Sequence, residues 1–462
     1  MEKLTAAEIA KMTGGKIVCG NELTECVAAE IDSRRVTPHC VFFAIKGQTT
    51  DGHLYIDSAI EKGAEIIVIE RPLSELSLKN AENAVFIEVI SSERALGALA
   101  LAYRSRYEIP FVGVTGSVGK TTTKEMIYAV LSAKYNVLKS EGNYNSETGL
   151  PLSVLNLTKK HTASVLEMGM DAAGEIDYLT RIAKPAVAVI TNIGVSHIET
   201  LGSRKNILKA KLEIENGLGA DGTLVLNADD DMLFGVAGSL SHPIIYYGIE
   251  NPCAGYRAEN IRYLADKTVF TVVTPYESFE AEIKAFGKHN VLNALAAAVA
   301  GYLTGLTTAE IIKGLSNFVG EKMRQSIYEI NGVTVMEDCY NASPDSMRAA
   351  FDVIKRRNEK RKTAILADML ELGEKSPEYH FKTGVEAAKV FDTVICYGEM
   401  AKNTVNGANS VKQGCAFHCE SSEQAAKMLI EKSQKGDIIL FKASRGMKAE
   451  ECIAKFKEGW KE

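Results

Sequence analysis

The sequence lacks the long apolar runs of a membrane protein. Its longest apolar stretch, residues 291–306, is rich in alanine and is interrupted by Asn293. A helix needs about 20 apolar residues to cross a bilayer, so we expect no membrane span and interpret this stretch as a buried helix. The first 15 residues have the pattern of an amphipathic helix, without the apolar core and cleavage site of a signal peptide. We therefore expect a cytoplasmic protein.

An excess of positive charge and a paired cysteine pattern are also absent. The formal net charge is -6, so we expect no nucleic-acid partner, and anionic ligands need local sites. The nine cysteines are odd in number and show no paired spacing, which suits a reducing compartment. Cys415, His418 and Cys419 lie close in sequence. A zinc site would need a fourth ligand and usually a second cluster, so an ordinary loop is favoured there.

The composition is that of a globular protein with several hydrophobic cores. Hydrophobic residues make up 46% and charged residues 24% of the chain. A length of 462 residues, at roughly 100–200 residues per domain, suggests three domains. The pattern of apolar runs changes near residues 108 and 320. We therefore predict domains over residues 1–107, 108–319 and 320–462.

Short apolar runs separated by helical patterns predict an α/β fold in each domain. The expected strands are residues 41–45, 66–69, 111–114, 163–166, 186–190, 223–226, 333–336, 363–366, 393–396 and 438–441. Helices are expected over residues 55–62 and 121–134. We predict a small α/β N-terminal domain, a central P-loop ATPase domain with a parallel or mixed sheet, and a C-terminal Rossmann-like open α/β domain.

The strongest motif is a glycine-rich turn between an expected strand and an expected helix. It consists of Gly116, Ser117, Val118, Gly119, Lys120, Thr121 and Thr122. Backbone N–H groups at such a helix start cradle phosphates, while the lysine neutralises phosphate oxygens and the hydroxyl of Thr121 can bind Mg²⁺. The motif departs from the strict Walker A spacing, because Val114 stands where the first glycine would be. We still predict phosphate binding over a plain connector.

Two residues at later strand ends could complete a metal site. Glu167 follows the apolar run 163–166, and His197 follows the run 186–190. Taken alone, Glu167 is more often a surface acid, and His197 is more often a core histidine with its hydrogen bonds satisfied. Because ligands gather at the carboxyl ends of strands in open α/β sheets, both become candidate Mg²⁺ ligands beside the phosphate loop.

These motifs resemble those of the Mur ligase family. The segments "VTGSVGKTTTKE", "EMGM", "TNIGVSHIE", "AKLEI" and "GKHNVLNALAA" occur in that family's order, and the resemblance covers essentially the whole chain. It implies ATP and Mg²⁺ as cofactors, Lys120 as a catalytic residue, and Thr121, Glu167, His197 and a carbamylated Lys211 as metal ligands. It also assigns nucleotide contacts to Asn290, Asn293, Arg324 and Asp338. Without the family, Asn290 is only a helix N-cap.

Four segments, one in the first domain, one in the linker and two in the third domain, resemble the branch of the family that adds D-alanyl-D-alanine to UDP-N-acetylmuramoyl-tripeptide. The first, "DSRRVTPHCVFFAIKGQTTDGH", implies a UDP-sugar site at Ser33, Arg34, Phe43, Gly47, Asp51, Gly52 and His53. The segments "EDCYNASPDSM", "LADMLELG" and "KASRGM" imply substrate contacts by Tyr340, Asn341, Asp368, Glu371, Lys442, Ser444 and Arg445, and we add Asn143 and Asn145. The Asp-Asn-Pro-Arg sequence typical of the diamino-acid-adding branch is missing.

The resemblance implies a reaction in which ATP converts the tripeptide carboxylate to an acyl phosphate, which the amine of the dipeptide then attacks. We expect a monomer whose three domains move during the reaction. Two other functions remain open at this point. The chain could be another amide ligase, such as the diamino-acid-adding enzyme or a folylpolyglutamate synthetase, or it could be a regulatory module driven by nucleotide hydrolysis. The requirement for both acceptors separates these alternatives.

Overall fold

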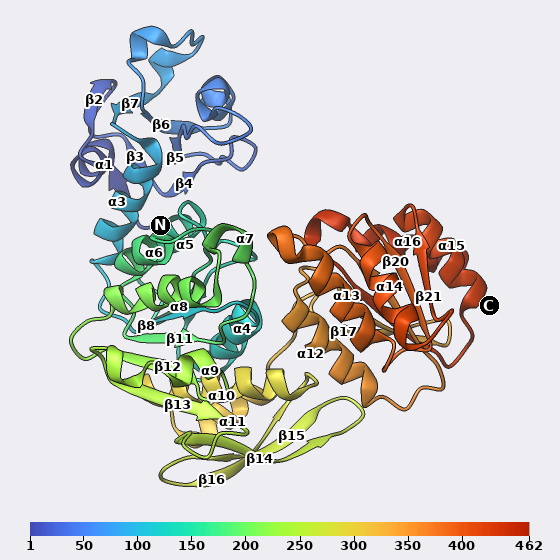
Figure 1. Ribbon diagram of the computed structural model, residues 1–462. Coiled ribbons are helices and arrows are strands. Elements are labelled where there is room, and N and C mark those ends of the chain that lie inside the picture. The colour runs from blue at the N-terminus through green and yellow to red at the C-terminus, as the bar shows by residue number, and fades with distance from the viewer. Residues whose placement is uncertain (462) are drawn as a thin grey trace.

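The protein consists of three α/β units, each built around its own sheet (Figure 1). The computed structural model describes residues 1–461. In Figure 1 the N-terminal unit, in blue, lies above the central unit, in green and yellow, and the C-terminal unit, in orange and red, lies beside the central one. No helix in the described chain is long and apolar enough to cross a membrane.

The N-terminal unit has a five-stranded sheet in the order β2-β7-β6-β5-β4, with a separate β1-β3 pair. Strands β4 to β7 are parallel and β2 is antiparallel. Its elements are β1 Leu4–Thr5, α1 Ala6–Thr13, β2 Lys16–Cys19, β3 Glu25–Cys26, β4 Ala28–Glu30, β5 Cys40–Phe43, α2 Ile56–Glu61, β6 Ala64–Ile69, β7 Val85–Glu88 and α3 Ser92–Arg104.

Helix α3 joins this unit to the central one, because it packs on α1 and also on α5 (Gly149–Leu155) and α6 (Glu175–Ala183) of the central unit. The hydroxyl of Tyr103 donates to the carbonyl oxygen of Leu157 at 2.7 Å. The guanidinium of Arg104 donates to the carbonyl oxygen of Ala183 at 2.8 Å. These bonds satisfy polar groups at the buried end of the helix and attach the N-terminal unit to the central one.

The central unit has a nine-stranded sheet in the order β16-β15-β14-β13-β12-β11-β8-β10-β9. Its strands are β8 Phe111–Thr115, β9 Val137–Lys139, β10 Ala163–Glu167, β11 Val187–Ile190, β12 Thr223–Asn227, β13 Ile244–Gly248, β14 Tyr256–Tyr263, β15 Thr268–Val273 and β16 Ser278–Ile283. Its α-helices are α4 Lys120–Leu131, α5 Gly149–Leu155, α6 Glu175–Ala183, α7 Ile198–Leu201, α8 Arg204–Leu212, α9 Asp231–Phe234, α10 Lys288–Leu303 and α11 Thr308–Ser316.

Helix α10 is the buried helix expected from the alanine-rich stretch. Its residues from Ala294 to Ala300 are completely buried. The helix packs on α4 and α11 and against strands β11 to β15. Small side chains allow this close approach on several faces at once. Helix α4 begins directly after the glycine-rich turn. The packing of α10 against α4 therefore also supports the phosphate loop.

The C-terminal unit has a six-stranded sheet in the order β17-β18-β22-β19-β20-β21, parallel except for β17. Its elements are β17 Ser326–Ile330, β18 Val333–Asp338, α12 Pro344–Lys355, β19 Lys362–Ala367, α13 Ser376–Ala387, β20 Thr393–Tyr397, α14 Ala401–Val411, β21 Ala416–Cys419, α15 Ser422–Lys432, β22 Ile438–Lys442 and α16 Ala449–Gly459. This arrangement confirms the predicted open α/β fold.

The expected strands are all present, with ends shifted by a few residues. The central sheet is mixed, within the expectation, because it carries an antiparallel edge formed by β14 to β16. One feature differs from the expectation. The Cys415–Cys419 segment, expected as a loop, contains strand β21, because its backbone pairs with β20 and both cysteines are buried.

Candidate active site

The candidate site lies where three neighbouring strands of the central sheet end. Strand β8 is flanked by β10 and β11, and both pair with it in parallel. The glycine-rich turn follows β8, Glu167 is the last residue of β10, and His197 lies beyond the end of β11. Parallel register therefore brings three separate sequence motifs to one edge of the sheet, which is the usual ligand site of such sheets.

The phosphate loop turns sharply into α4. Gly119 has a φ of 86°, in the left-handed region that favours glycine. A Cβ added there would also lie 3.0 Å from Oδ1 of Asn293. Within residues 1–461 no side chain caps the start of α4, so the first N–H groups of the helix can bind an anion. The Lys120 ammonium donates to the carbonyl oxygen of Gly116 at 2.9 Å, which folds it over the loop.

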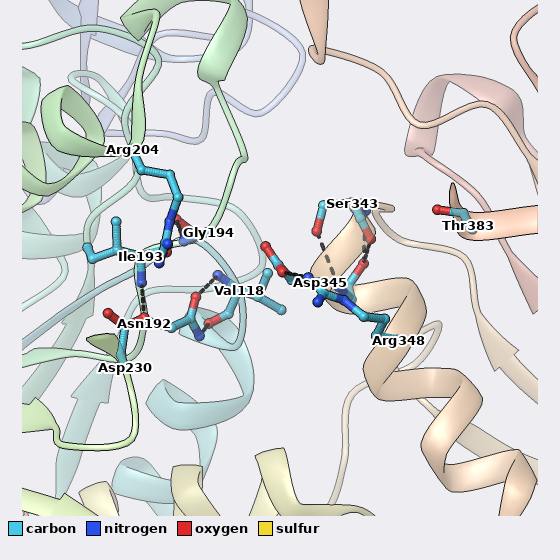
Figure 2. A network of polar contacts seen from close by, with 12 residues as sticks. Val118, Asn192, Ile193, Gly194, Arg204, Asp230, Ser343, Asp345, Arg348 and Thr383 are labelled. Carbon is cyan, nitrogen blue, oxygen red and sulfur yellow. Dashed lines mark hydrogen bonds and ion pairs between the residues drawn. The ribbon is translucent and has the colours of Figure 1, made fainter. Parts of the chain in front are cut away.

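The loop is held by the segment that follows β11, as Figure 2 shows. The side-chain amide of Asn192 donates to the carbonyl oxygen of Val118 at 2.8 Å and accepts from the Val118 N–H at 3.0 Å. The hydroxyl of Thr191 donates to the same carbonyl oxygen at 2.6 Å. Three hydrogen bonds thus fix the Val118 peptide groups, which preorganises the loop for a phosphate.

Across the cleft from the loop lies the first turn of α12, which belongs to the C-terminal unit (Figure 2). A Cβ added to Gly194 would lie 2.3 Å from Oδ2 of Asp345. That oxygen is buried and has no hydrogen-bond partner in the described chain. Glycine at position 194 therefore allows the C-terminal unit to approach the phosphate loop. Asp345 was not among the site residues expected from the sequence.

The residues at the strand ends fit a hard divalent cation. The Glu167 carboxylate is almost completely buried. Its Oε1 accepts from the side-chain amide of Asn145 at 2.8 Å, and its Oε2 has no partner among the described residues. The hydroxyl-bearing Thr121 is also buried, on the first turn of α4. A buried carboxylate oxygen without a donor is costly unless a cation binds there, so this geometry suits Mg²⁺.

His197 is a further candidate metal ligand that the central unit contributes, beside Glu167 and Thr121. Burial lowers its pKa to about 4, with further repulsion from the ammonium groups of Lys120 and Lys211. The imidazole is therefore neutral near pH 7 and has a lone pair for a metal. Its Nδ1 lies 3.2 Å from a carboxylate oxygen of Asp171 and 3.2 Å from one of Glu371. Glu371 belongs to the C-terminal unit, so this contact crosses the cleft.

Lys211 lies behind these groups on α8 and is only 1% exposed. Burial lowers its pKa well below the usual range, and the Lys120 ammonium lowers it further. Lys209, two positions earlier on the same helix, is exposed. No three His, Cys, Asp or Glu side chains in the described chain cluster as a metal site. A metal here therefore depends on Thr121, phosphate oxygens or an altered Lys211 besides Glu167 and His197.

A cavity of about 820 Å³ extends from the phosphate loop to the C-terminal unit. The predicted site residues that line it are Ser117, Val118, Gly119, Lys120, Thr121, Thr122, Asn143, Asn145, Glu167, His197, Asn290, Asn293, Arg324, Asp338, Tyr340, Asn341, Glu371 and Lys442. Gly116 and Lys211 lie just outside this lining. The volume suits a nucleotide together with the reacting end of a second molecule.

At the C-terminal wall of the cavity, Lys442 is almost completely buried. Its ammonium donates to Oδ2 of Asp338 at 2.7 Å and to the carbonyl oxygen of Asn341 at 3.2 Å. These bonds position Asp338 and Asn341 beside the nucleotide side of the cavity.

Three residues expected to bind the dipeptide do not line the cavity. The Asp368 carboxylate accepts from the N–H groups of Ala401 and Met400 and caps α14. Ser444 is buried, and its hydroxyl accepts from the N–H of Leu370. Arg445 is exposed and forms an ion pair with Glu450. Their contact with substrate stays a prediction.

The residues expected around the UDP-sugar lie in the N-terminal unit, away from this cavity. His53 is buried, and its Nδ1 lies 2.7 Å from Oδ1 of Asp51, whose other oxygen pairs with Arg71. A Cβ on Gly52 would lie 2.7 Å from the backbone of Ile45. The cluster therefore shapes a tight turn after β5.

The other UDP-sugar candidates differ in accessibility. Arg34 is exposed and pairs with Asp32, and Gly47 is exposed. Ser33 is buried, and its carbonyl oxygen accepts from Lys62. Phe43 is completely buried in the core, because every residue of β5 is covered. Its side chain therefore cannot face a ligand, which corrects that part of the expectation.

Sequence reasoning missed several lining residues at the far end of the cavity. Phe286, His289 and Gln325 line the cavity beside Asn290. Gln325 lies between the central and C-terminal units in sequence, where no local motif identifies it. His289 could have been predicted as a lining residue, because it stands directly before Asn290 in the segment "GKHN".

Comparison with known proteins places these features in a family. The Mur ligase middle domain matches residues 114–301, the Mur ligase glutamate ligase domain matches residues 323–445, and the Mur ligase family catalytic domain matches residues 28–104. The chain is 39% identical, over 98% of both chains, to the UDP-N-acetylmuramoyl-tripeptide--D-alanyl-D-alanine ligase of Bacillus subtilis. Among solved structures, it is similar to MurF from Acinetobacter baumannii, with a TM-score of 0.92, 30% identity and 99% coverage of both chains. It also resembles the Thermotoga maritima MurF ligase in complex with ADP, with a TM-score of 0.83, 31% identity, and 94% and 97% coverage.

Proposed function

The chain belongs to the Mur ligase family, and from this we propose that it joins D-alanyl-D-alanine to UDP-N-acetylmuramoyl-tripeptide. The reaction consumes ATP, uses Mg²⁺, and passes through an acyl phosphate of the tripeptide. The observation that carries the proposal is the shared cavity, in which the phosphate loop of one unit faces Glu371 and Lys442 of another. Full-length similarity to ligases of this specificity supports the choice of substrates.

The protein's own groups account for binding and activation. The N–H groups at the start of α4 and the Lys120 ammonium hold the nucleotide phosphates. Glu167, His197 and Thr121 hold Mg²⁺, which when bound neutralises phosphate charge. The neutral imidazole of His197 binds the metal without repelling it. Catalysis then depends mainly on positioning and charge neutralisation.

The three units divide the substrates between them in this proposal. Residues 1–107 bind the UDP-sugar, residues 108–319 bind ATP, and residues 320–462 bind the incoming dipeptide. The Glu371 contact to His197 brings the C-terminal unit to the edge of the phosphate site. Closure of this cleft would exclude water, which otherwise hydrolyses an acyl phosphate. We further propose that the enzyme acts as a cytoplasmic monomer.

ADP release is expected to require ATP, Mg²⁺, UDP-N-acetylmuramoyl-tripeptide and D-alanyl-D-alanine together. Omission of any component should reduce the rate to background, because phosphate transfer needs the carboxylate and turnover needs the amine. A coupled ADP assay, with the peptide product identified by mass spectrometry, checks this. Efficient turnover with the UDP-dipeptide and a free diamino acid would instead show a different branch of the family. ATP hydrolysis without either acceptor would show a regulatory ATPase.

We expect Arg445→Gln to raise the KM for D-alanyl-D-alanine by about 10-fold, because a charge-assisted hydrogen bond to its carboxylate is lost. The KM for ATP should stay nearly unchanged. Lys448→Gln is the matched control, since Lys448 is an exposed cation three residues away. Initial rates at varied dipeptide and varied ATP separate the two constants. Equal increases in both would place Arg445 outside the dipeptide site.

A further inference from the structure

A chain of side-chain hydrogen bonds runs along the wall of the nucleotide cavity, from α4 to the linker before β17. The hydroxyl of Thr123 donates to Oδ1 of Asn293 at 3.0 Å, and the amide of Asn293 donates to Oδ1 of Asn290 at 3.2 Å. The amide of Asn290 donates to Oε1 of Gln325 at 3.0 Å, and the Gln325 amide lies 2.9 Å from Nε2 of His289. Every amide points the same way, so the bonds polarise one another.

The carbonyl oxygen of Phe286 fixes the direction of the chain, because the side-chain amide of Asn290 donates to it at 2.8 Å as well as to Gln325. Burial lowers the pKa of His289, so its ring is neutral and Nε2 can accept from the Gln325 amide. Rotating the Gln325 amide by 180° would place its NH₂ group against the NH₂ group of Asn290, leaving two buried donors facing each other. The amide orientations therefore follow from the network as a unit.

The linker that Gln325 belongs to is held in a strained conformation. Met323 has a φ of 64° and Gln325 a φ of 53°, both in the left-handed region although neither is glycine. Such a conformation persists only where the surroundings fix it. The Tyr340 N–H donates to the carbonyl oxygen of Met323 at 3.2 Å. The turn is further restrained by the two side-chain bonds of Gln325 and by the Ser326 hydroxyl, which donates to the carbonyl oxygen of Glu321 at 3.2 Å.

Arg324 stands between these two strained residues and lines the cavity. Its guanidinium carbon lies 4.1 Å from the ring centroid of Tyr340. Its Nε lies 3.5 Å from a carboxylate oxygen of Glu321 but, within residues 1–461, makes no hydrogen bond despite being buried. A partly buried cation whose Nε–H has no hydrogen-bond partner within residues 1–461 is suited to an anionic ligand in the cavity.

We propose that Gln325 is a positioning residue that holds the strained linker so that Arg324 faces the nucleotide. Through Asn290, Asn293 and Thr123, the same bonds connect the helix of the phosphate loop to the joint between the central and C-terminal units. Gln325 does not contact the reacting atoms. It acts through Arg324, because both of its side-chain partners, Asn290 and His289, lie on α10 and hold the turn against the central unit. The inference rests on the proposed function only in placing a nucleotide in this cavity.

The test measures ADP affinity by equilibrium titration, without either acceptor. Gln325→Met keeps the side-chain length and removes both hydrogen bonds, so we expect ADP to bind about 10-fold more weakly. Lys322→Met is the control, because Lys322 is an exposed residue of the same linker, and its affinity should stay within about 2-fold of the wild type. An unchanged affinity in Gln325→Met would overturn the proposal.

A double-mutant cycle separates positioning of Arg324 from a general structural role. If Gln325 acts through Arg324, adding Gln325→Met to Arg324→Met should weaken ADP binding by less than about 2-fold. Additive losses would instead show that Gln325 acts independently, and would overturn the positioning role. Because no peptide substrate is present, an error in the proposed ligase specificity would leave these results unchanged and would appear only in the ADP release assay.

Discussion

Lys120→Ala is expected to lower kcat by at least about 100-fold, the scale of removing one strong electrostatic partner of a transition state. The Lys120 ammonium lies over the phosphate loop, bonded only to the carbonyl oxygen of Gly116. A phosphate in the loop would replace that carbonyl as its partner. The ammonium would then neutralise charge on the transferring phosphoryl group, so its loss should slow the phosphoryl-transfer step.

The fold should survive this substitution, because the side-chain hydrogen bond that Lys120 makes within residues 1–461 stays inside the loop. Steady-state rates, circular dichroism and thermal melting check both statements. Lys205→Ala provides the control, since Lys205 is an exposed lysine on α8. If melting and turnover of Lys120→Ala both match the wild type, the loop is not the catalytic phosphate site.

Lys211→Ala is expected to lose most activity, by about 100-fold or more, if a carbamate on this lysine is a metal ligand. An unmodified ammonium would repel Mg²⁺ and has no lone pair to offer it. Burial favours the neutral amine at position 211. A neutral amine can add to carbon dioxide and release a proton, which creates an anionic oxygen ligand suited to a hard cation.

Lys209→Ala is the matched control, because the two lysines lie on one helix but on faces roughly 200° apart. Lys209 is exposed, so its loss should change activity little. Lys211→Met preserves most of the buried volume and guards against loss of activity through unfolding. A small carboxylate in the buffer should partly restore Lys211→Ala by filling the vacated position. Near-normal activity of Lys211→Ala without bicarbonate would exclude the catalytic carbamate.

The phosphate loop could be predicted because its information is local. A strand, a glycine-rich turn and a helix start follow one another within a short segment, and Gly119 adopts the left-handed conformation that its place in the turn requires. Glu167 and His197 were predicted from the same reasoning, since parallel strands place their carboxyl ends together. The order of β8, β10 and β11 in the sheet agrees with that expectation.

Other expectations depended on exposure, which the linear pattern does not reveal. Phe43 lies in a motif-bearing segment, yet its side chain is in the core. The Asp368 carboxylate follows a strand end, as Glu167 does, but it turns to cap α14 instead of facing the cavity. Strand-end position alone cannot distinguish these two carboxylates, because the direction of a side chain depends on which helix packs beside it.

The three α/β units, the phosphate loop and the family could be predicted without a structure, because they depend on strand periodicity and on motifs contained within short segments. The contacts between the units could not be predicted in this way. Only the tertiary structure placed Asp345 against Gly194, Glu371 against His197, and Gln325 between Asn290 and His289. These partners are separated by many residues in the chain. Their contacts arise from the packing of whole domains, which sums many weak interactions that no local pattern records.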